Sequence, residues 1–282
     1  MNLGELKKRY VEINKIKKGG QKIVYKVKTG DDATYALKIL SDVADPRVQQ
    51  EIELVGKLSL PNVPRIIETG VVYDENILEE VRYIVEEYIE GISLRDWLAR
   101  GNRAGLKFAY SILESLLMTE VILENNKILH RDINPNNIML GTNGVIYLID
   151  FGLAKNLLGP SYTLTAAAHG PFTPGYAPNE QFTNQKMLQD VRTDLFQIGV
   201  TIYEICKGAN PFVKPDESIM QAVSRTLNDV PPLLRIGGDT KGMFANLVNI
   251  LMAKNQSQRP DSAKDALRYL YAIKPTLRLE DE

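Results

Sequence analysis

Residues 130–152 read HRDINPNNIMLGTNGVIYLIDFG, and this stretch decides the fold. Asp132 and Asn137 share one short loop, and Asp150 follows two short apolar runs that flank the turn Gly141–Gly144 and predict a small hairpin. Three oxygen-bearing side chains can therefore converge on one point. This set suits Mg²⁺, which proteins hold with one or two carboxylates together with substrate phosphates. A remaining carboxylate can orient a hydroxyl nucleophile and accept its proton.

The triplet HRD at 130–132, the asparagine five residues after its aspartate, and the triplet DFG at 150–152 resemble the signature of the eukaryotic-type (Hanks-type) protein kinase superfamily. An isolated HRD triplet arises often by chance, but the ordered set around a predicted hairpin does not. The resemblance implies ATP as the phosphoryl donor, Asp132 as the catalytic base, and Asn137 and Asp150 as ligands of Mg²⁺, with Mn²⁺ as a substitute.

The first ninety residues are predicted to be mostly β. Two alternating runs rich in β-branched and aromatic residues surround the turn Gly30-Asp31-Asp32 and predict a hairpin. A helical pattern opens at Pro46 and closes at the cluster Pro61–Pro64. The predicted strands are Lys22–Lys28, Thr34–Leu40, Arg65–Tyr73 and Val81–Ile89.

After Gly91 the pattern becomes helical, apart from an irregular stretch at 152–180 rich in Gly, Pro, Thr and Ala, of the kind that is usually functional. We therefore expect an α+β, two-lobed, protein-kinase-like fold in a single kinase domain within residues 1–282. Its expected parts are a small N-lobe at about 10–85, a hinge at 86–92, a larger helical C-lobe at 93–273 and a tail at 274–282. The predicted helices are Leu106–Asn125, Val191–Cys206, Met243–Ala253 and Ser262–Ile273.

The run Tyr35-Ala36-Leu37-Lys38 resembles the strand motif whose lysine contacts the ATP phosphates, and Ala36 would then pack on adenine. In the helix that follows, the resemblance makes Glu51 the ion-pair partner of Lys38, with Glu53 a close competitor. A lone lysine or glutamate is usually a solvated surface charge. The ordered set of motifs argues against that interpretation for Lys38.

The phosphate-binding loop departs from the family. A G-x-G-x-x-G-x-V frame anchored on Val24 keeps only the central glycine, Gly19, which Gly20 follows. Glycine serves where a backbone approaches a ligand closely. The loop is therefore expected to be stiffer than usual or to lie differently over the nucleotide, and its lysines either supply charge to phosphates or are simply solvated.

The connector VEEYIEG at 85–91 resembles the kinase hinge, which implies adenine contacts from the Glu87 carbonyl and the Ile89 amide, with Met139 also in the nucleotide-binding set. This alignment places Glu86 at the gatekeeper position, normally apolar or Thr. A buried carboxylate is costly unless it is paired. Glu86 therefore either bonds a polar partner or the alignment is off by one residue.

The run TPGYAPNE at 173–180 resembles the end of a kinase activation segment, so that Glu180 would pair with Arg259 and Asp194 would buttress the catalytic loop. Asn134 departs from the family pattern, because Ser/Thr kinases usually have Lys at this position. Its amide can donate to a phosphate oxygen but adds no charge. The resemblance gives Asp132, Lys38 and Asn134 as the catalytic set. Arg131 can receive an activation-segment phosphate. The candidate phosphosites are Ser161, Tyr162, Thr163, Thr165 and Thr173.

Composition and charge limit the partners and the cellular location that the sequence allows. The 282 residues carry 34 Lys+Arg against 35 Asp+Glu, so no basic excess points to nucleic acid as a partner. Residues 5–28 nevertheless carry net +7, around the phosphate loop, and residues 74–96 carry net −6. One cysteine, Cys206, fits a reducing compartment, and no membrane segment or signal peptide is evident, so the expected location is cytoplasmic.

The resemblance thus implies ATP- and Mg²⁺-dependent phosphoryl transfer to Ser/Thr hydroxyls of a protein substrate, with autophosphorylation. The compact form is more similar to prokaryotic than to animal members, and no regulatory partner can be read from the chain.

One alternative is a small-molecule kinase like the aminoglycoside phosphotransferases, which normally lack the segment at 173–180. A second is a catalytically weak pseudokinase scaffold, which the incomplete glycine loop and Glu86 favour.

Overall fold

The computed structural model describes residues 2–18, 22–40, 56, 60–151, 155–156, 172–185 and 187–279. The chain divides into two compact units, Met1–Glu90 and Gly91–Glu282, here called the N-terminal and C-terminal units. The predicted helix that opens at Pro46 lies, except for Gly56, outside the described residues. None of the helices in the described part of the chain combines the length and hydropathy that a bilayer crossing requires.

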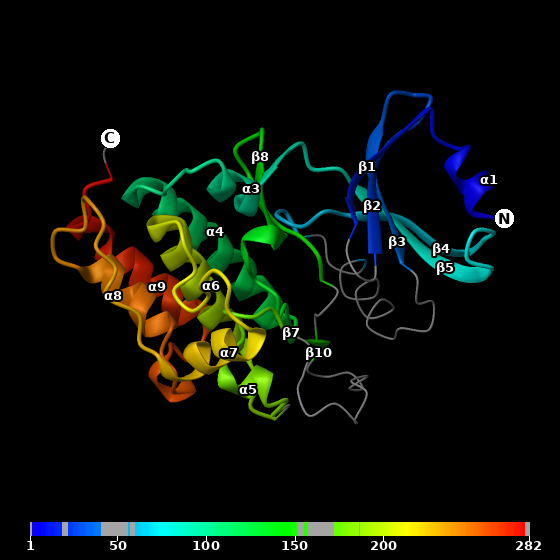
Figure 1. Cartoon of the computed structure of the whole chain (residues 1–282). Coiled ribbons are helices and arrows are strands. Elements are labelled where there is room, and N and C mark those ends of the chain that lie inside the picture. Colours follow the sequence, from blue (N-terminus) through cyan, green and yellow to red (C-terminus); the bar gives the residue numbers. More distant parts are fainter. Residues whose placement is uncertain are drawn as a thin grey trace. The chain divides into compact units, whose positions relative to one another are not determined.

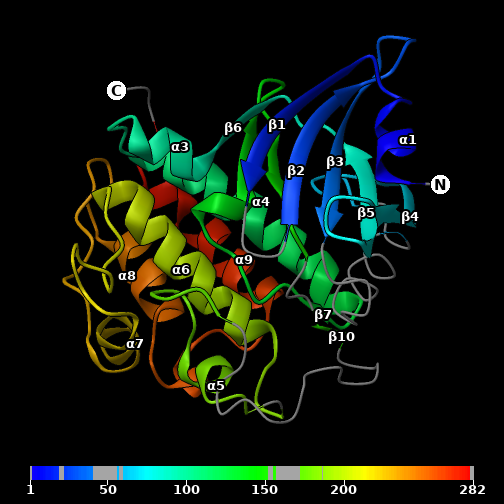
Figure 2. The same ribbon diagram turned by 45° about the vertical axis from the view of Figure 1, so that its right-hand side comes forward.

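The N-terminal unit is an antiparallel five-stranded sheet in the order β1-β2-β3-β5-β4, with the short helix α1 beside it (Figures 1 and 2). The predicted hairpin is confirmed with the predicted bounds, as β2 and β3. Its turn includes Asp32 at φ 73°. The elements are α1 (Leu3–Lys7), β1 (Glu12–Lys18), β2 (Lys22–Lys28), β3 (Thr34–Leu40), β4 (Ile66–Asp74) and β5 (Glu79–Glu87).

Alternation along the strands gives this sheet two different faces. One face is apolar and packs against Leu3 and Leu6 of α1, whose first turn is closed by a capping box between Asn2 and Glu5. The opposite face carries Ala36, Lys38, Ile84 and Glu86. The buried residues of the apolar face and of α1 are Leu3, Leu6, Val27, Leu37, Ile39, Val72, Val81, Tyr83 and Val85.

The C-terminal unit is mostly helical. Helix α4 packs on α6 and α9, and α8 packs on α6 and α9 (Figures 1 and 2). Its helices are α3 (Leu94–Ala99), α4 (Leu106–Asn125), α5 (Asn179–Phe182), α6 (Val191–Lys207), α7 (Ile219–Asn228), α8 (Met243–Leu251) and α9 (Ala263–Ile273), with 3-10 turns η1 (Pro135–Asn137), η2 (Gln256–Gln258) and η3 (Lys274–Thr276). Its strands are β6 (Gly91–Ser93), β7 (Ile128–Leu129), β8 (Ile138–Gly141), β9 (Ile146–Leu148) and β10 (Lys155–Asn156).

The long predicted helices and the small hairpin, β8–β9, are confirmed, with ends that shift by up to two residues. Helix α6 begins after the N-cap Asp190 and ends before the C-cap Gly208, whose φ of 79° suits a glycine. Gly199 permits the close packing of α6 on α8, because a Cβ there would lie 2.8 Å from Cβ of Leu251. Trp97 lies in α3, the first helix after the connector, and packs on Phe108.

Candidate catalytic site

The loop between β7 and β8 holds the HRD motif in a strained shape. Arg131 has φ 65°, a left-handed conformation that costs a non-glycine residue on the order of 1–3 kcal/mol. Its backbone amide donates to Asp194 Oδ1 (2.7 Å), and its carbonyl oxygen accepts from Nε2 of Gln181 and Nε2 of Gln197 (2.8 Å each). These three contacts compensate for the strained backbone.

Asp194 buttresses this loop, as the sequence predicts. It is fully buried on α6, and its Oδ2 accepts from the backbone amide of His130 at 2.8 Å. Gln197, one turn further along α6, accepts from the backbone amide of Ile133 at 2.7 Å. Helix α6 therefore fixes the loop on both sides of Asp132.

Glu120 lies near this support and was missed by the sequence interpretation. It is fully buried on α4, and neither carboxyl oxygen has a hydrogen-bond partner among the described residues. Burial raises the pKa of Glu120 well above its usual range, and the negative charges of Asp194 and Glu124 add to the effect. The neutral acid is therefore the form that the folded protein favours.

We expect Glu120→Leu to stabilise the protein by about 1–3 kcal/mol at neutral pH, because it removes an unsatisfied buried carboxyl group. A carboxyl group whose pKa is raised on folding contributes stability at low pH that is lost as pH rises above the unfolded-state value. The gain should therefore be larger at pH 8 than at pH 5. Thermal unfolding at both pH values measures it, with the half-buried Glu114→Leu on the same helix as the control. An equal or lower midpoint for Glu120→Leu at pH 8 would contradict this interpretation.

The carboxylate of Asp132 is held by three side chains. Oδ1 accepts from Thr173 Oγ1 (2.5 Å) and Asn134 Nδ2 (3.0 Å), and Oδ2 accepts from Asn137 Nδ2 (2.7 Å). Burial raises the pKa of Asp132 to about 6; the charge of Asp150 adds to the rise, and the three hydrogen bonds oppose it. The group is thus ionised at neutral pH and still a better proton acceptor than an ordinary aspartate.

Asn137 and Asp150 fit a divalent cation. The Asn137 amide nitrogen donates to both the carbonyl and the carboxylate of Asp132, which leaves its amide oxygen as the atom for a ligand. Asp150 follows β9, and the adjacent Ile149 amide donates to the Asn137 carbonyl at 2.9 Å. One amide oxygen and one carboxylate are hard ligands of the type that Mg²⁺ takes when phosphates complete its shell.

Asn134 is 2% exposed and bonded within the loop. Its amide nitrogen donates to the carbonyl and the carboxylate of Asp132, and its Oδ1 accepts from the backbone amide and side chain of Asn136. Here the amide is directed at the predicted base. Donation from Asn134 to a phosphate stays a prediction.

The predicted nucleotide-binding residues of the N-terminal unit lie on β2, β3 and β5. The cross-strand register sets Val24 opposite Lys38 and Ala36 opposite Glu86, so these four side chains share the face opposite α1. Lys38 Nζ lies 2.8 Å from Glu86 Oε2, which confirms that the gatekeeper carboxylate has a polar partner. Three residues assigned to this set, Gly19, Gly20 and Glu51, lie outside the described residues.

The other residues that are predicted to bind the nucleotide lie at the end of β5, shortly after β5, and in β8. Glu87 ends β5, and its amide donates to the Arg65 carbonyl at 2.9 Å. Ile89 is buried, and Met139 lies in β8 opposite Tyr147. Among the candidate phosphosites only Thr173 is described, and its hydroxyl is bonded to Asp132; Ser161, Tyr162, Thr163 and Thr165 lie outside the described residues.

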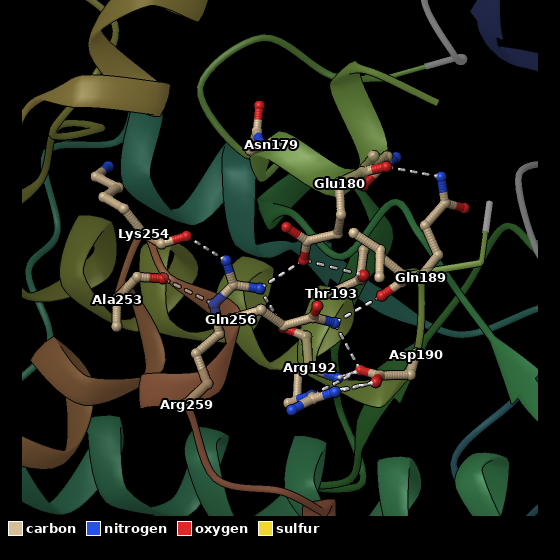
Figure 3. Close-up of polar contacts among 12 residues, drawn as sticks. Asn179, Glu180, Gln189, Asp190, Arg192, Thr193, Ala253, Lys254, Gln256 and Arg259 are labelled. Carbon is tan, nitrogen blue, oxygen red and sulfur yellow. Dashed lines mark hydrogen bonds and ion pairs between the residues drawn. The ribbon is translucent and has the colours of Figure 1, made fainter. Parts of the chain in front are cut away.

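The predicted ion pair between Glu180 and Arg259 is confirmed (Figure 3). Arg259 Nη1 lies 2.6 Å from Glu180 Oε1, and the Arg259 side chain is fully buried. The guanidinium also donates to the carbonyl oxygens of Arg192 (2.9 Å), Ala253 (2.8 Å) and Lys254 (3.3 Å). This pair ties the segment at 173–180 to the helical core.

A second, partly buried cluster was not predicted from the sequence. Arg95 of α3 donates to Glu204 Oε1 (2.7 Å) and to the Tyr176 hydroxyl (2.8 Å), and that hydroxyl donates to Glu204 Oε2. Burial raises the pKa of the Tyr176 phenol, so it stays protonated. The available signal was a glutamate inside the apolar pattern of α6, since such a residue needs a buried partner.

Comparison with known proteins agrees with this geometry. The family model described as "Protein kinase domain" matches residues 10–279. Similar proteins include a probable serine/threonine-protein kinase of Clostridium perfringens (28% identity, 94% of this chain) and serine/threonine-protein kinase PknB of Mycolicibacterium smegmatis (31% identity, 82% of this chain). The matches cover 38% and 37% of those two relatives, so the chain spans well under half the length of either. The chain belongs to the protein kinase domain family.

Proposed function

We propose that this chain is an ATP-dependent protein kinase that phosphorylates serine and threonine. The observation that carries the proposal is the partly buried Asp132 carboxylate, which the charge of Asp150 influences and which the side chains of Asn134, Asn137 and Thr173 hold. A carboxylate whose pKa lies between that of an ordinary aspartate and neutral pH suits a general base.

The proposed reaction is a direct transfer. The substrate hydroxyl oxygen forms a bond to the γ-phosphorus of ATP, the bond from that phosphorus to the bridging oxygen breaks, ADP leaves, and the hydroxyl proton passes to Asp132. Asn134 and Thr173 would hold the Asp132 carboxylate in the orientation that the reaction needs. Lys38 is proposed to bind the nucleotide phosphates.

Mg²⁺ is the proposed cation, with Mn²⁺ as a substitute, and Asn137 and Asp150 would hold it. When bound, it would neutralise charge on the phosphate oxygens. The adenine contacts from Ala36, Glu87 and Ile89, and the phosphate contacts from the loop around Gly19 and Gly20, stay predictions from the family resemblance.

Serine and threonine are the proposed acceptors because the names of the similar bacterial proteins specify them and because Thr173 bonds the proposed base. The proposed partners are ATP and a protein substrate, and the cytoplasm is the proposed location. Autophosphorylation at Ser161, Thr163 or Thr165 is part of the proposal. Arg131 would receive that phosphate; in this structure its guanidinium reaches Gln189 at 3.4 Å.

The test is a competition between substrate classes. The chain is incubated with γ-labelled ATP and Mg²⁺ beside a basic protein, a casein-type acidic protein and a panel of small alcohols that includes aminoglycosides. Label on protein serine or threonine supports the proposal. Faster turnover of any small alcohol would identify a small-molecule kinase, and nucleotide binding without transfer to any acceptor would identify a pseudokinase.

The expected pH dependence of kcat/KM follows from the protonation state of Asp132. The base must be ionised, so the rate should fall as pH drops through about 6. Thr173→Val removes a hydrogen bond that lowers the pKa of Asp132, so the acidic limb should move to higher pH. Thr183→Val, which removes an exposed hydroxyl bonded to the Asn179 carbonyl, is the control and should leave the limb in place. An unchanged limb in Thr173→Val would contradict the assignment of Asp132 as the base.

A further inference from the structure

Lys38 and Glu86 form a buried ion pair within one sheet. Their side chains are 7% and 12% exposed, and Lys38 Nζ lies 2.8 Å from Glu86 Oε2. Both partners belong to central strands, β3 and β5, which are neighbours in the sheet. In the family resemblance the partner of this lysine is a helix glutamate, Glu51, and the gatekeeper is normally apolar or Thr.

The strand register fixes the pair. Lys38 stands opposite Ile84, and Glu86 stands opposite Ala36, so the two side chains are diagonal neighbours on the same face. A contact of this kind is set by the backbone ladder of the sheet.

Burial distinguishes this pair from the other ion pairs described in the N-terminal unit. In each of those pairs both side chains are at least 33% exposed, where water screens the attraction. Removing one partner of a buried pair leaves a buried charge without compensation, which is strongly unfavourable. The less buried pairs are Arg9–Glu68, Lys26–Glu90, Lys28–Asp32 and Arg65–Glu87.

We propose that Glu86 is a positioning residue for Lys38, which it holds from within the sheet so that the lysine ammonium is aligned for nucleotide phosphates. This proposal rests on the proposed function, in which Lys38 binds the phosphates. Glu86 itself acts through the lysine and does not touch the reacting atoms.

The test compares the affinities for Mg²⁺-ATP and for adenosine, measured by titration calorimetry on the whole chain. Glu86→Gln and Glu86→Thr keep a polar side chain but remove the carboxylate. Because Lys38 would reach only the phosphates, ATP affinity should fall about tenfold or more while adenosine affinity changes less than about twofold. Glu86→Asp restores the charge and should recover most of the ATP affinity. The exposed Glu80→Gln, on the same strand, is the matched control.

Each other outcome overturns the proposal. Equal losses for ATP and adenosine would mean that Glu86 only supports the sheet, unchanged ATP affinity would mean that Lys38 needs no such partner, and tighter ATP binding would mean that Glu86 competes with the phosphates. A further variant, Lys38→Met, does not depend on the folding of the Glu86 variants. It should lower ATP affinity about tenfold or more while adenosine affinity changes less than about twofold.

These results are separable from the proposed kinase activity, because binding is measured without turnover. Wild-type protein that binds ATP through Lys38 but transfers no phosphate would refute the proposed function and leave the role of Glu86 standing. If Lys38→Met leaves ATP affinity unchanged, the role of Glu86 fails even in an active kinase.

Discussion

Arg259→Met is expected to destabilise the protein by about 3–5 kcal/mol, since it breaks a buried ion pair and leaves one charge uncompensated. The guanidinium is fully buried, and Glu180 would lose its 2.6 Å partner while its own side chain stays 5% exposed. Three carbonyl oxygens would lose a donor as well. At about 2–4 °C for each kcal/mol, the thermal midpoint should fall by roughly 6–20 °C.

Two variants sharpen this test. Arg259→Lys keeps the charge but not the planar fork that reaches several acceptors at once, so an intermediate loss is expected. Arg268→Met removes an exposed pair with Asp265, in which the side chains are 69% and 47% exposed, and should cost less than about 1 kcal/mol. A midpoint for Arg259→Met as close to wild type as that of Arg268→Met would show that the pair does not hold the segment at 173–180.

Asp132→Asn is expected to lower kcat by about 10²–10⁴-fold, because the amide cannot accept the hydroxyl proton. The change keeps the size of the side chain and leaves Asn137 and Asp150 in the sequence, so ATP binding should persist within about threefold. Radiolabel transfer measures the rate, and calorimetric titration with Mg²⁺-ATP measures the binding. Asp216→Asn, in an exposed turn, is the matched control. Asp132→Asn with the wild-type rate would exclude Asp132 as the base.

Much of the fold could be predicted because local patterns carry it. The hairpin β2–β3 follows from two alternating runs around a glycine-containing turn, and α4 follows from twenty residues of helical periodicity with the observed bounds. Helix α7 was missed although Ser218 and Gln221 form a capping box at its start. That short signal precedes a helix in which only three residues are buried, so the apolar pattern was weak.

The candidate site also has some contacts that could be predicted from the sequence and others that could not. The supports from Asp194 and the pair of Glu180 with Arg259 could be predicted because family motifs fix their spacing. The pairing of Lys38 with Glu86 could not, since it depends on the register of two strands that are far apart in sequence. The burial of Glu120 could have been predicted from the sequence, because this residue lies one helical turn after Leu116 and Leu117 on the buried face of α4.

The most direct test of the central claim is phosphoamino-acid analysis after incubation with γ-labelled ATP, Mg²⁺ and a protein acceptor, for the wild-type chain beside Asp150→Ala. We expect labelled phosphoserine or phosphothreonine with the wild type and none above background with the variant, which lacks the proposed cation ligand. Equal labelling by both proteins, or none by either under conditions where the wild type binds ATP, would contradict a protein kinase built on Asp132, Asn137 and Asp150.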